Sequence, residues 1–297
     1  MWKKEFNISV IIPVYNRNVS LIRAIDSLYA QTYSVHEIIV IDDNSRFCVD
    51  YLLKDYNGVK VVRNSKNLGA AQSRNIGFDQ ANGNYVAFLD SDDYWHPLKL
   101  EKQIEVAIEY QDVGIIYCDQ FVVDKHNNIY ESEIELIDRD LWIHLINGWT
   151  APNTSTLLFK KNVFKNLEGF DSDLRSCQEH DLWMTIAYKN EQVKFSAEKL
   201  SFFCMGEENR ISFDYNNRIN GATMFLKKWK VDITNTLGSA HYDWFKRDYY
   251  FKISLPVFIY CLRNKRIVRA FIIYIKYLSL YPKFYITLKE HINGIRN

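Results

Sequence analysis

Short apolar runs and amphipathic segments alternate along much of the chain. The apolar runs are rich in β-branched residues, which is typical of buried strands, and the segments between them carry apolar residues at helical spacing. This alternation predicts an α/β fold with a mostly parallel central sheet flanked by helices. We expect strands at 8–14, 37–41, 59–62, 85–89, 113–117 and 155–159, and helices at 20–31, 70–81, 96–110, 141–146 and 178–188.

The pattern changes after about residue 215, where strand signals fade and helical ones dominate. We therefore expect an α/β domain over 1–215 and a C-terminal basic helical region over 216–297. Basic residues between 263 and 269 interrupt the longest apolar stretch, so no span reaches the roughly 18 to 20 apolar residues that a transmembrane helix requires.

Composition and charge add one feature to this picture. Of 297 residues, 47% are hydrophobic and 25% are charged, which is ordinary for a folded protein. From Lys246 onward, the chain has eleven basic and two acidic residues, so this part carries a net charge of +9 and the rest of the chain −8. Such a tail favours an anionic surface, either membrane lipid or nucleic acid. The five cysteines are scattered without a CxxC pair, which fits a cytoplasmic protein.

The candidate chemistry centres on an acidic run, Asp90-Ser91-Asp92-Asp93, at the end of the expected strand 85–89. Crowded carboxylates repel one another and are tolerated where a divalent cation offsets their charge, although a solvated acidic turn is the alternative. Polar clusters also follow the strands that end near Val14 and Ile41. Because ligands of parallel sheets lie at the carboxyl ends of the strands, we expect these loops to converge on one crevice.

Four ordered motifs stand out in the first half of the chain, namely Ser9 to Arg17, Ile38 to Ser45, Asn67 to Gly69 with Arg74 to Gly77, and Leu89 to Asp93. The chain has no GxGxxG after its first strand, no Walker A loop and no HExxH helix. Together the four motifs resemble those of family 2 glycosyltransferases of the GT-A fold, and the resemblance covers roughly residues 7–212.

The resemblance implies a site for the nucleotide of a UDP-sugar. Asp43 would accept the uracil imide N–H and Asp42 would shape the turn, whereas capping and a tight turn are the alternative for both. Arg74 would either approach the nucleotide or brace the acidic loops. The expected nucleotide-binding residues are Pro13, Tyr15, Asn16, Arg17, Asp42, Asp43, Asn67, Gly69, Arg74, Asp90, Ser91 and Asp92.

The resemblance also implies a Mn²⁺ or Mg²⁺ that bridges the diphosphate. One carboxylate of the acidic run would bind the ribose and another the metal. We expect Asp90 and Asp92 on the ribose side and Asp92 or Asp93 as the metal ligand, a choice that the sequence leaves open.

A second constellation, Ser176 to Trp183, resembles the acidic motif that begins the acceptor-side helix of the family. Alignment of its Leu-Trp pair places Glu179 at the catalytic position, where the family more often has Asp, and leaves Asp181 as the reserve base. Inversion needs a base on the face of the sugar opposite the leaving group. The alternative is that both are first-turn carboxylates favoured by the helix dipole.

Further residues are expected near the donor sugar or the acceptor, namely Trp95, Trp149, Asn153 and Trp183. For Trp95 the alternative is an anchor for the following helix, and for 148–155 it is a plain turn. Many relatives carry a histidine where this chain has the segment 205–212. Either Arg210 or Glu207 takes over part of that role, or the loop does not bind phosphate.

These features predict an inverting, metal-dependent glycosyltransferase in surface glycan biosynthesis. It would move a hexose or N-acetylhexosamine from a UDP-sugar to a hydroxyl of a lipid-linked saccharide. The basic helices would touch the cytoplasmic face of the inner membrane peripherally, and no nucleic acid partner is expected. A sugar-nucleotide nucleotidylyltransferase and a noncatalytic carbohydrate-binding protein are the alternatives.

Overall fold

The computed structural model of the chain describes residues 6–131, 140–148, 151–205, 215–263 and 265–275. The chain divides into two compact units. This division reflects contacts and not function, so the expected α/β domain over 1–215 stays a prediction. The larger unit comprises residues 1–142, 150–173 and 178–208, and the smaller one comprises residues 143–149, 174–177 and 209–297.

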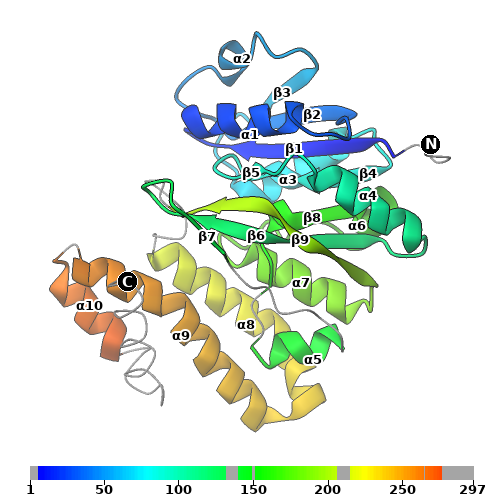
Figure 1. Ribbon diagram of the computed structural model, residues 1–297. Coiled ribbons are helices and arrows are strands. Elements are labelled where there is room, and N and C mark those ends of the chain that lie inside the picture. The colour runs from blue at the N-terminus through cyan, green and yellow to red at the C-terminus, as the bar shows by residue number, and fades with distance from the viewer. Residues whose placement is uncertain (1–5, 132–139, 149–150, 206–214, 264, 276–297) are drawn as a thin grey trace. The chain divides into compact units, whose positions relative to one another are not determined.

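The larger unit is built on one mixed sheet (Figure 1). Its described strands follow the order β3-β2-β1-β4-β8-β6-β9-β5, and β7 pairs with β6 outside that order. The strands are β1 (Ile8–Val14), β2 (Glu37–Asp42), β3 (Val59–Arg63), β4 (Tyr85–Phe88), β5 (Tyr94–Trp95), β6 (Ile115–Val123), β7 (Ile129–Glu131), β8 (Leu157–Lys160) and β9 (Val193–Cys204).

The block β3-β2-β1-β4 is parallel throughout and is covered by helices on both faces. On one face, alternate residues of β1 such as Val10 and Ile12 form a core with α1 (Val19–Tyr29) and α4 (Lys99–Glu109). On the other face lies α3 (Ala70–Gln80), where a Cβ atom on Gly77 would come within 2.4 Å of Ile11 Cγ2. Gly77 thus permits the close approach of α3 to the sheet.

The rest of the sheet is mixed. Strand β8 runs antiparallel to β4 and β6, β9 runs parallel to β6, and β5 runs antiparallel to β9. The α/β class with a flanked central sheet is therefore confirmed, with parallel pairing among the first four strands of the order and between β6 and β9. The sequence did not predict β5, which has two residues, or β9, in which lysine and glutamate interrupt the apolar pattern.

Among the remaining short elements, the helices at 141–146 and 178–188 match the expected segments, whereas the helical segments at 49–52, 154–156 and 161–166 were not predicted. Helix α4 begins three residues later than expected, because Pro97 disfavours helical backbone at His96. These elements are α2 (Val49–Leu52), α5 (Leu141–Ile146), the 3₁₀ turn η1 (Thr154–Thr156), α6 (Lys161–Asn166) and α7 (Gln178–Tyr188).

The smaller unit contains the helices α8 (Tyr215–Leu237), α9 (Ser239–Arg263) and α10 (Ile267–Ile273). The rings of Phe225 and Tyr249 stack between α8 and α9 with their centres 4.6 Å apart. Helix α10 buries Ala270 and Ile273 in a cluster with α9. Of the helices in the described ranges, none is long and apolar enough to cross a bilayer. The part of the basic tail after residue 275 lies outside the described residues.

Candidate active site

The loops that follow β1 and β2 are tied to each other by hydrogen bonds. The backbone N–H of Asn16 donates to Ser45 Oγ at 2.9 Å, and the backbone N–H of Arg46 donates to Asn16 Oδ1 at 2.8 Å. Asn16 has a φ of 54°, a left-handed conformation that asparagine tolerates better than most residues. The expected convergence of these two loops at the carboxyl edge of the sheet is present.

Asp42 holds the turn after β2 together. It is fully buried, its Oδ1 accepts from the backbone N–H of Ser45 at 2.8 Å, and its Oδ2 accepts from Arg63 Nη1 at 2.7 Å. These contacts are those of a residue that shapes a turn, which is the role expected for Asp42.

Asp43 joins the same loop to the segment before α3. Its carboxylate accepts from Asn64 Nδ2 at 2.9 Å and from the backbone N–H groups of Leu68 and Gly69, each at 2.8 Å. Only 3% of Asp43 is exposed. Three of the roughly four acceptor positions of a carboxylate are therefore used within the protein. The expected contact with uracil stays a prediction and would use the position that is left.

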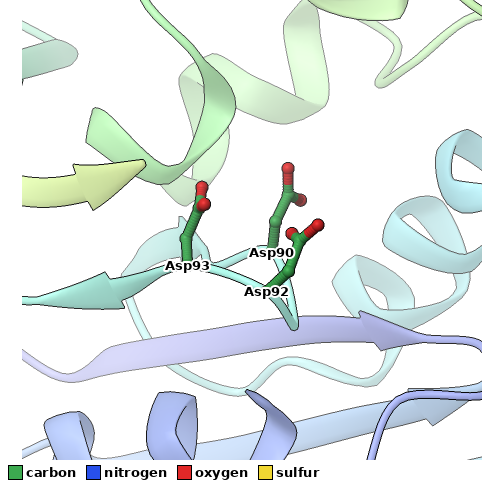
Figure 2. Close-up of side chains that lie close together, drawn as sticks. All are labelled: Asp90, Asp92 and Asp93. Carbon is green, nitrogen blue, oxygen red and sulfur yellow. The ribbon is translucent and has the colours of Figure 1, made fainter. Parts of the chain in front are cut away.

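The acidic run follows β4, and its three carboxylates extend from the same side of their loop (Figure 2). One ligand oxygen from each of Asp90, Asp92 and Asp93 lies within 4.8 Å of the others. Such a set of carboxylate oxygens suits a hard divalent cation such as Mg²⁺ or Mn²⁺. Asp92 Oδ2 lies 3.9 Å from Arg17 Nη2, which brings the loop after β1 to the same place.

Asp93 differs from its two neighbours in burial and in contacts. It is fully buried, whereas Asp90 and Asp92 are partly exposed. Its Oδ2 accepts from Ser155 Oγ at 2.8 Å, and its Oδ1 accepts from the backbone N–H of Cys204 at 3.1 Å. Asp93 therefore fastens the acidic loop to the protein.

Arg74 connects the acidic run with the start of α7. It is buried, donates to Asp90 Oδ1, and donates to Gln178 Oε1 at 3.2 Å. Burial opposes the charge of Arg74, but the carboxylates of Asp90, Glu179 and Asp92 outweigh this effect and raise its pKa. Of the two alternatives for Arg74, bracing the acidic run is the one that these contacts match.

Glu179 and Asp181 both lie in the first turn of α7. Glu179 is partly exposed and lies close enough to Arg74 to raise its pKa, whereas Asp181 is only 3% exposed. Helix α7 therefore begins beside the acidic run. Glu179 is the more accessible of the two carboxylates.

Two of the expected sugar-contacting residues lie in the core. Trp95 is 2% exposed and donates its ring N–H to Ser155 O at 2.8 Å, while Trp183 is fully buried and donates to Pro152 O at 2.9 Å. This placement contradicts the expected sugar contacts, because neither ring presents a face or its N–H to a ligand. For Trp95 the alternative of an internal anchor is the better description.

Asn153 and Trp149 complete the expected sugar site. Asn153 stands at the start of η1, and in the described part of the chain its buried amide atoms have no hydrogen-bond partner, so it keeps its place as a candidate. Trp149 lies outside the described residues, as do Glu207 and Arg210.

Sequence reasoning missed two side chains that contact the acidic run. Ser155 donates to Asp93, and Arg23 Nη2 donates to the backbone carbonyl of Asp92 at 2.6 Å. Ser155 lies in a segment expected to be a strand, and Arg23 lies within an ordinary amphipathic helix. Neither position carries a local signal of its role.

The chain was compared with known proteins. The sequence model described as Glycosyl transferase family 2 matches residues 9–165. An uncharacterized glycosyltransferase of Haemophilus influenzae is 29% identical over 69% of this chain and 70% of its own length. The amylovoran biosynthesis glycosyltransferase AmsB of Erwinia amylovora is 30% identical over 60% of this chain and 63% of its own length.

Solved structures of S. aureus TarS share the fold. The complex of TarS 1-349 with UDP-GlcNAc matches with a TM-score of 0.66 and 21% identity, over 83% of this chain and 73% of that one. The complex with UDP matches with a TM-score of 0.61. The family model covers more than half of the chain, and the chain therefore belongs to glycosyl transferase family 2. It is a glycosyltransferase, and the nucleotidylyltransferase and the noncatalytic binder are set aside.

Proposed function

We propose that the protein is an inverting glycosyltransferase that transfers a hexose or N-acetylhexosamine from a UDP-sugar to a saccharide hydroxyl. The observation that carries this proposal is the bridge formed by Arg74, which holds Asp90 of the acidic run and Gln178, the residue before Glu179. This bridge supports the proposal because it brings the acidic run, proposed for the donor, next to the first turn of α7, proposed for the acceptor. The UDP-GlcNAc and UDP complexes of TarS support a UDP-sugar as the donor class.

On the donor side, the loops after β1 and β2 would enclose the nucleotide, with Asp43 at the uracil and Asp90 at the ribose. Asp92 or Asp93 would be the carboxylate ligand of Mn²⁺ or Mg²⁺. Each oxygen of Asp93 accepts a hydrogen bond, from Ser155 and from Cys204, which does not exclude a cation because a carboxylate oxygen has about two acceptor positions. A cation bound there would stabilise the charge that develops on the departing diphosphate by several kcal/mol, on the order found for metal-ion catalysis.

On the acceptor side, Glu179 would take the proton of the acceptor hydroxyl. The oxygen then attacks the anomeric carbon from the face opposite to UDP, and the bond between that carbon and the diphosphate oxygen breaks with its electron pair leaving on UDP. Asp181 is less suited to this role because it is almost fully buried.

The proposed acceptor is a lipid-linked saccharide, and we propose peripheral contact with the cytoplasmic face of a membrane through α10. This helix exposes Ile267, Val268, Phe271 and Ile272, each by more than half, directly after the exposed cations Lys265 and Arg266. An exposed apolar face beside basic residues suits the interface of an anionic bilayer. The naming of AmsB as an amylovoran biosynthesis enzyme supports a role in glycan assembly.

A panel of UDP-sugars incubated with Mn²⁺ tests the reaction. We expect slow UDP release with one donor or a few, loss of release with EDTA, and its return with added Mn²⁺. Nuclear magnetic resonance of the released sugar should show the anomeric configuration inverted relative to the donor. UDP release in the absence of metal would contradict the metal site. A released sugar with the same anomeric configuration as the donor would contradict the inverting mechanism.

A further inference from the structure

Three buried side chains on β5 and α4 contact one another and the turn η1, which touches the acidic run. Lys99 is fully buried, donates from Nζ to Gln103 Oε1 at 2.7 Å, and lies 3.9 Å from the centre of the Trp95 ring. Burial lowers the pKa of Lys99 to about 8, against a small opposing effect of Cys118. A cation against an aromatic face and an amide oxygen fixes all three side chains relative to one another. We call Trp95, Lys99 and Gln103 the core clamp.

The core clamp holds two consecutive carbonyl groups of η1. Trp95 Nε1 donates to the carbonyl of Ser155 at 2.8 Å, and Gln103 Nε2 donates to the carbonyl of Thr156 at 2.8 Å. Gln103 also donates to the carbonyl of Ile116 in β6 at 3.2 Å. Because these groups are buried, each lost hydrogen bond would leave a buried polar atom unsatisfied. The turn is therefore held rigidly.

The hydroxyl of Ser155 joins the two ends of the acidic run. It accepts from the backbone N–H of Asp90 at 3.1 Å and donates to Asp93 Oδ2 at 2.8 Å. One hydroxyl group thus sets the spacing between the first and last residue of the run, and Asp92 lies between them. Without that restraint, the mutual repulsion of the carboxylates would favour a wider loop.

We propose that Ser155 is a positioning residue for the metal-binding carboxylates and that the core clamp holds Ser155 in place. This inference rests on the proposed metal site. It means that residues that do not touch the substrate fix the separation of the metal-binding carboxylates. The physical reason is that a divalent cation binds tightly only where its ligands are already held at the right separation by surrounding hydrogen bonds.

The first test removes the hydroxyl group of Ser155 in the full chain. In Ser155→Ala we expect the dissociation constant for Mn²⁺, measured by calorimetry with UDP present, to rise about tenfold, because the Asp90 N–H and the Asp93 carboxylate each lose a partner. Thr154→Val is the matched control. Thr154 is equally buried in the same turn, and within the described residues its hydroxyl has no partner, so we expect a change of less than about twofold.

The second test asks whether the core clamp acts through Ser155. Trp95→Phe removes the N–H that holds the Ser155 carbonyl and keeps an aromatic face for Lys99. We expect it to weaken Mn²⁺ binding about fivefold in the wild-type background and to have no further effect in Ser155→Ala. If Trp95→Phe only destabilised the fold, it would lower the unfolding temperature, and its effect on Mn²⁺ binding would be the same with Ser155 or Ala at position 155.

The outcomes separate this inference from the proposed function. A wild-type chain that binds neither UDP nor Mn²⁺ overturns both. If the wild-type chain binds both, two results overturn the positioning role alone. One is a dissociation constant for Mn²⁺ in Ser155→Ala equal to that of the wild type. The other is a loss of Mn²⁺ affinity on Trp95→Phe that is the same in both backgrounds. If Ser155→Ala does not unfold cooperatively, Ser155→Cys replaces it. Its thiol is a weaker hydrogen-bonding group, so a smaller rise in the dissociation constant is expected and an unchanged one contradicts the role.

Discussion

At the scale of single residues, the carboxylates of the site differ in how deeply they are buried. The partly exposed group comprises Asp90, Asp92 and Glu179, and the buried group comprises Asp42, Asp43, Asp93 and Asp181. The sequence motifs do not distinguish the two groups. The distinction depends on donors from distant parts of the chain. For Asp93 these donors are 62 and 111 residues away in sequence.

The role of Glu179 is tested by Glu179→Gln. We expect unchanged affinity for UDP and a fall in kcat by a factor of roughly 10² to 10⁴, because the amide cannot accept the proton of the acceptor. Steady-state kinetics with a fixed donor and a calorimetric UDP titration measure the two quantities. His180→Gln, in the same helical turn, is the control and should stay near wild type. Retained turnover in Glu179→Gln, with loss in Asp181→Asn, would transfer the base to Asp181.

Lys99 gives a prediction about stability and pH. Its pKa is about 8 in the folded chain and 10.5 in the unfolded chain, so above pH 8 the unfolded state binds more protons. The free energy of unfolding should therefore increase by roughly 1 kcal/mol between pH 8 and pH 9 from the titration of Lys99. Ionisation of Cys118 opposes part of this rise in the same pH range, because burial raises the pKa of its thiol from 9.0 to about 11 and only the unfolded thiol ionises there.

Urea unfolding of the wild type and of Lys99→Met between pH 7.5 and 9 measures this effect. The variant should lack the rise, so the difference between the two free energies of unfolding should change with pH over this range. A constant difference would show that Lys99 does not titrate there.

At the scale of elements, α10 presents apolar residues on two sides. Ala270 and Ile273 pack within the cluster with α9, while Val268 and Phe271 are exposed by 76% and 61%. A soluble surface helix normally keeps its second face polar. The exposed face and the preceding Lys265 and Arg266 are the basis of the proposed membrane contact.

The double substitution Phe271→Ser with Ile272→Ser tests this contact. We expect the fraction bound to vesicles with about a third of anionic lipid to fall at least about tenfold, because each apolar side chain contributes on the order of 1.5 to 3 kcal/mol when it leaves water. Sedimentation with vesicles measures the bound fraction, and UDP affinity should not change. Tyr51→Ser removes a similarly exposed aromatic residue of α2 and should have no effect. Equal binding of all three proteins would rule out α10 as the contact.

Several elements followed from the sequence and others did not. The strands 8–14 and 37–41 were predicted because their apolar runs are nearly continuous, and the helix 178–188 was predicted because its apolar residues recur at helical spacing. Strand β9 was missed although it supplies the N–H that holds Asp93, because its pairing with β6 and β5 and not its composition makes it a strand.

At the scale of the whole molecule, the sequence determined the α/β class, the family and the position of the acidic run. These features can be read locally, because buried strands need continuous apolar runs and the acidic run consists of neighbouring residues in the sequence. The tertiary structure decided which carboxylates are buried, that Trp95 and Trp183 are core residues, and that Arg74 joins the acidic run to α7. Those outcomes depend on hydrogen bonds and burial between residues that are far apart in the chain, and no local pattern records such contacts.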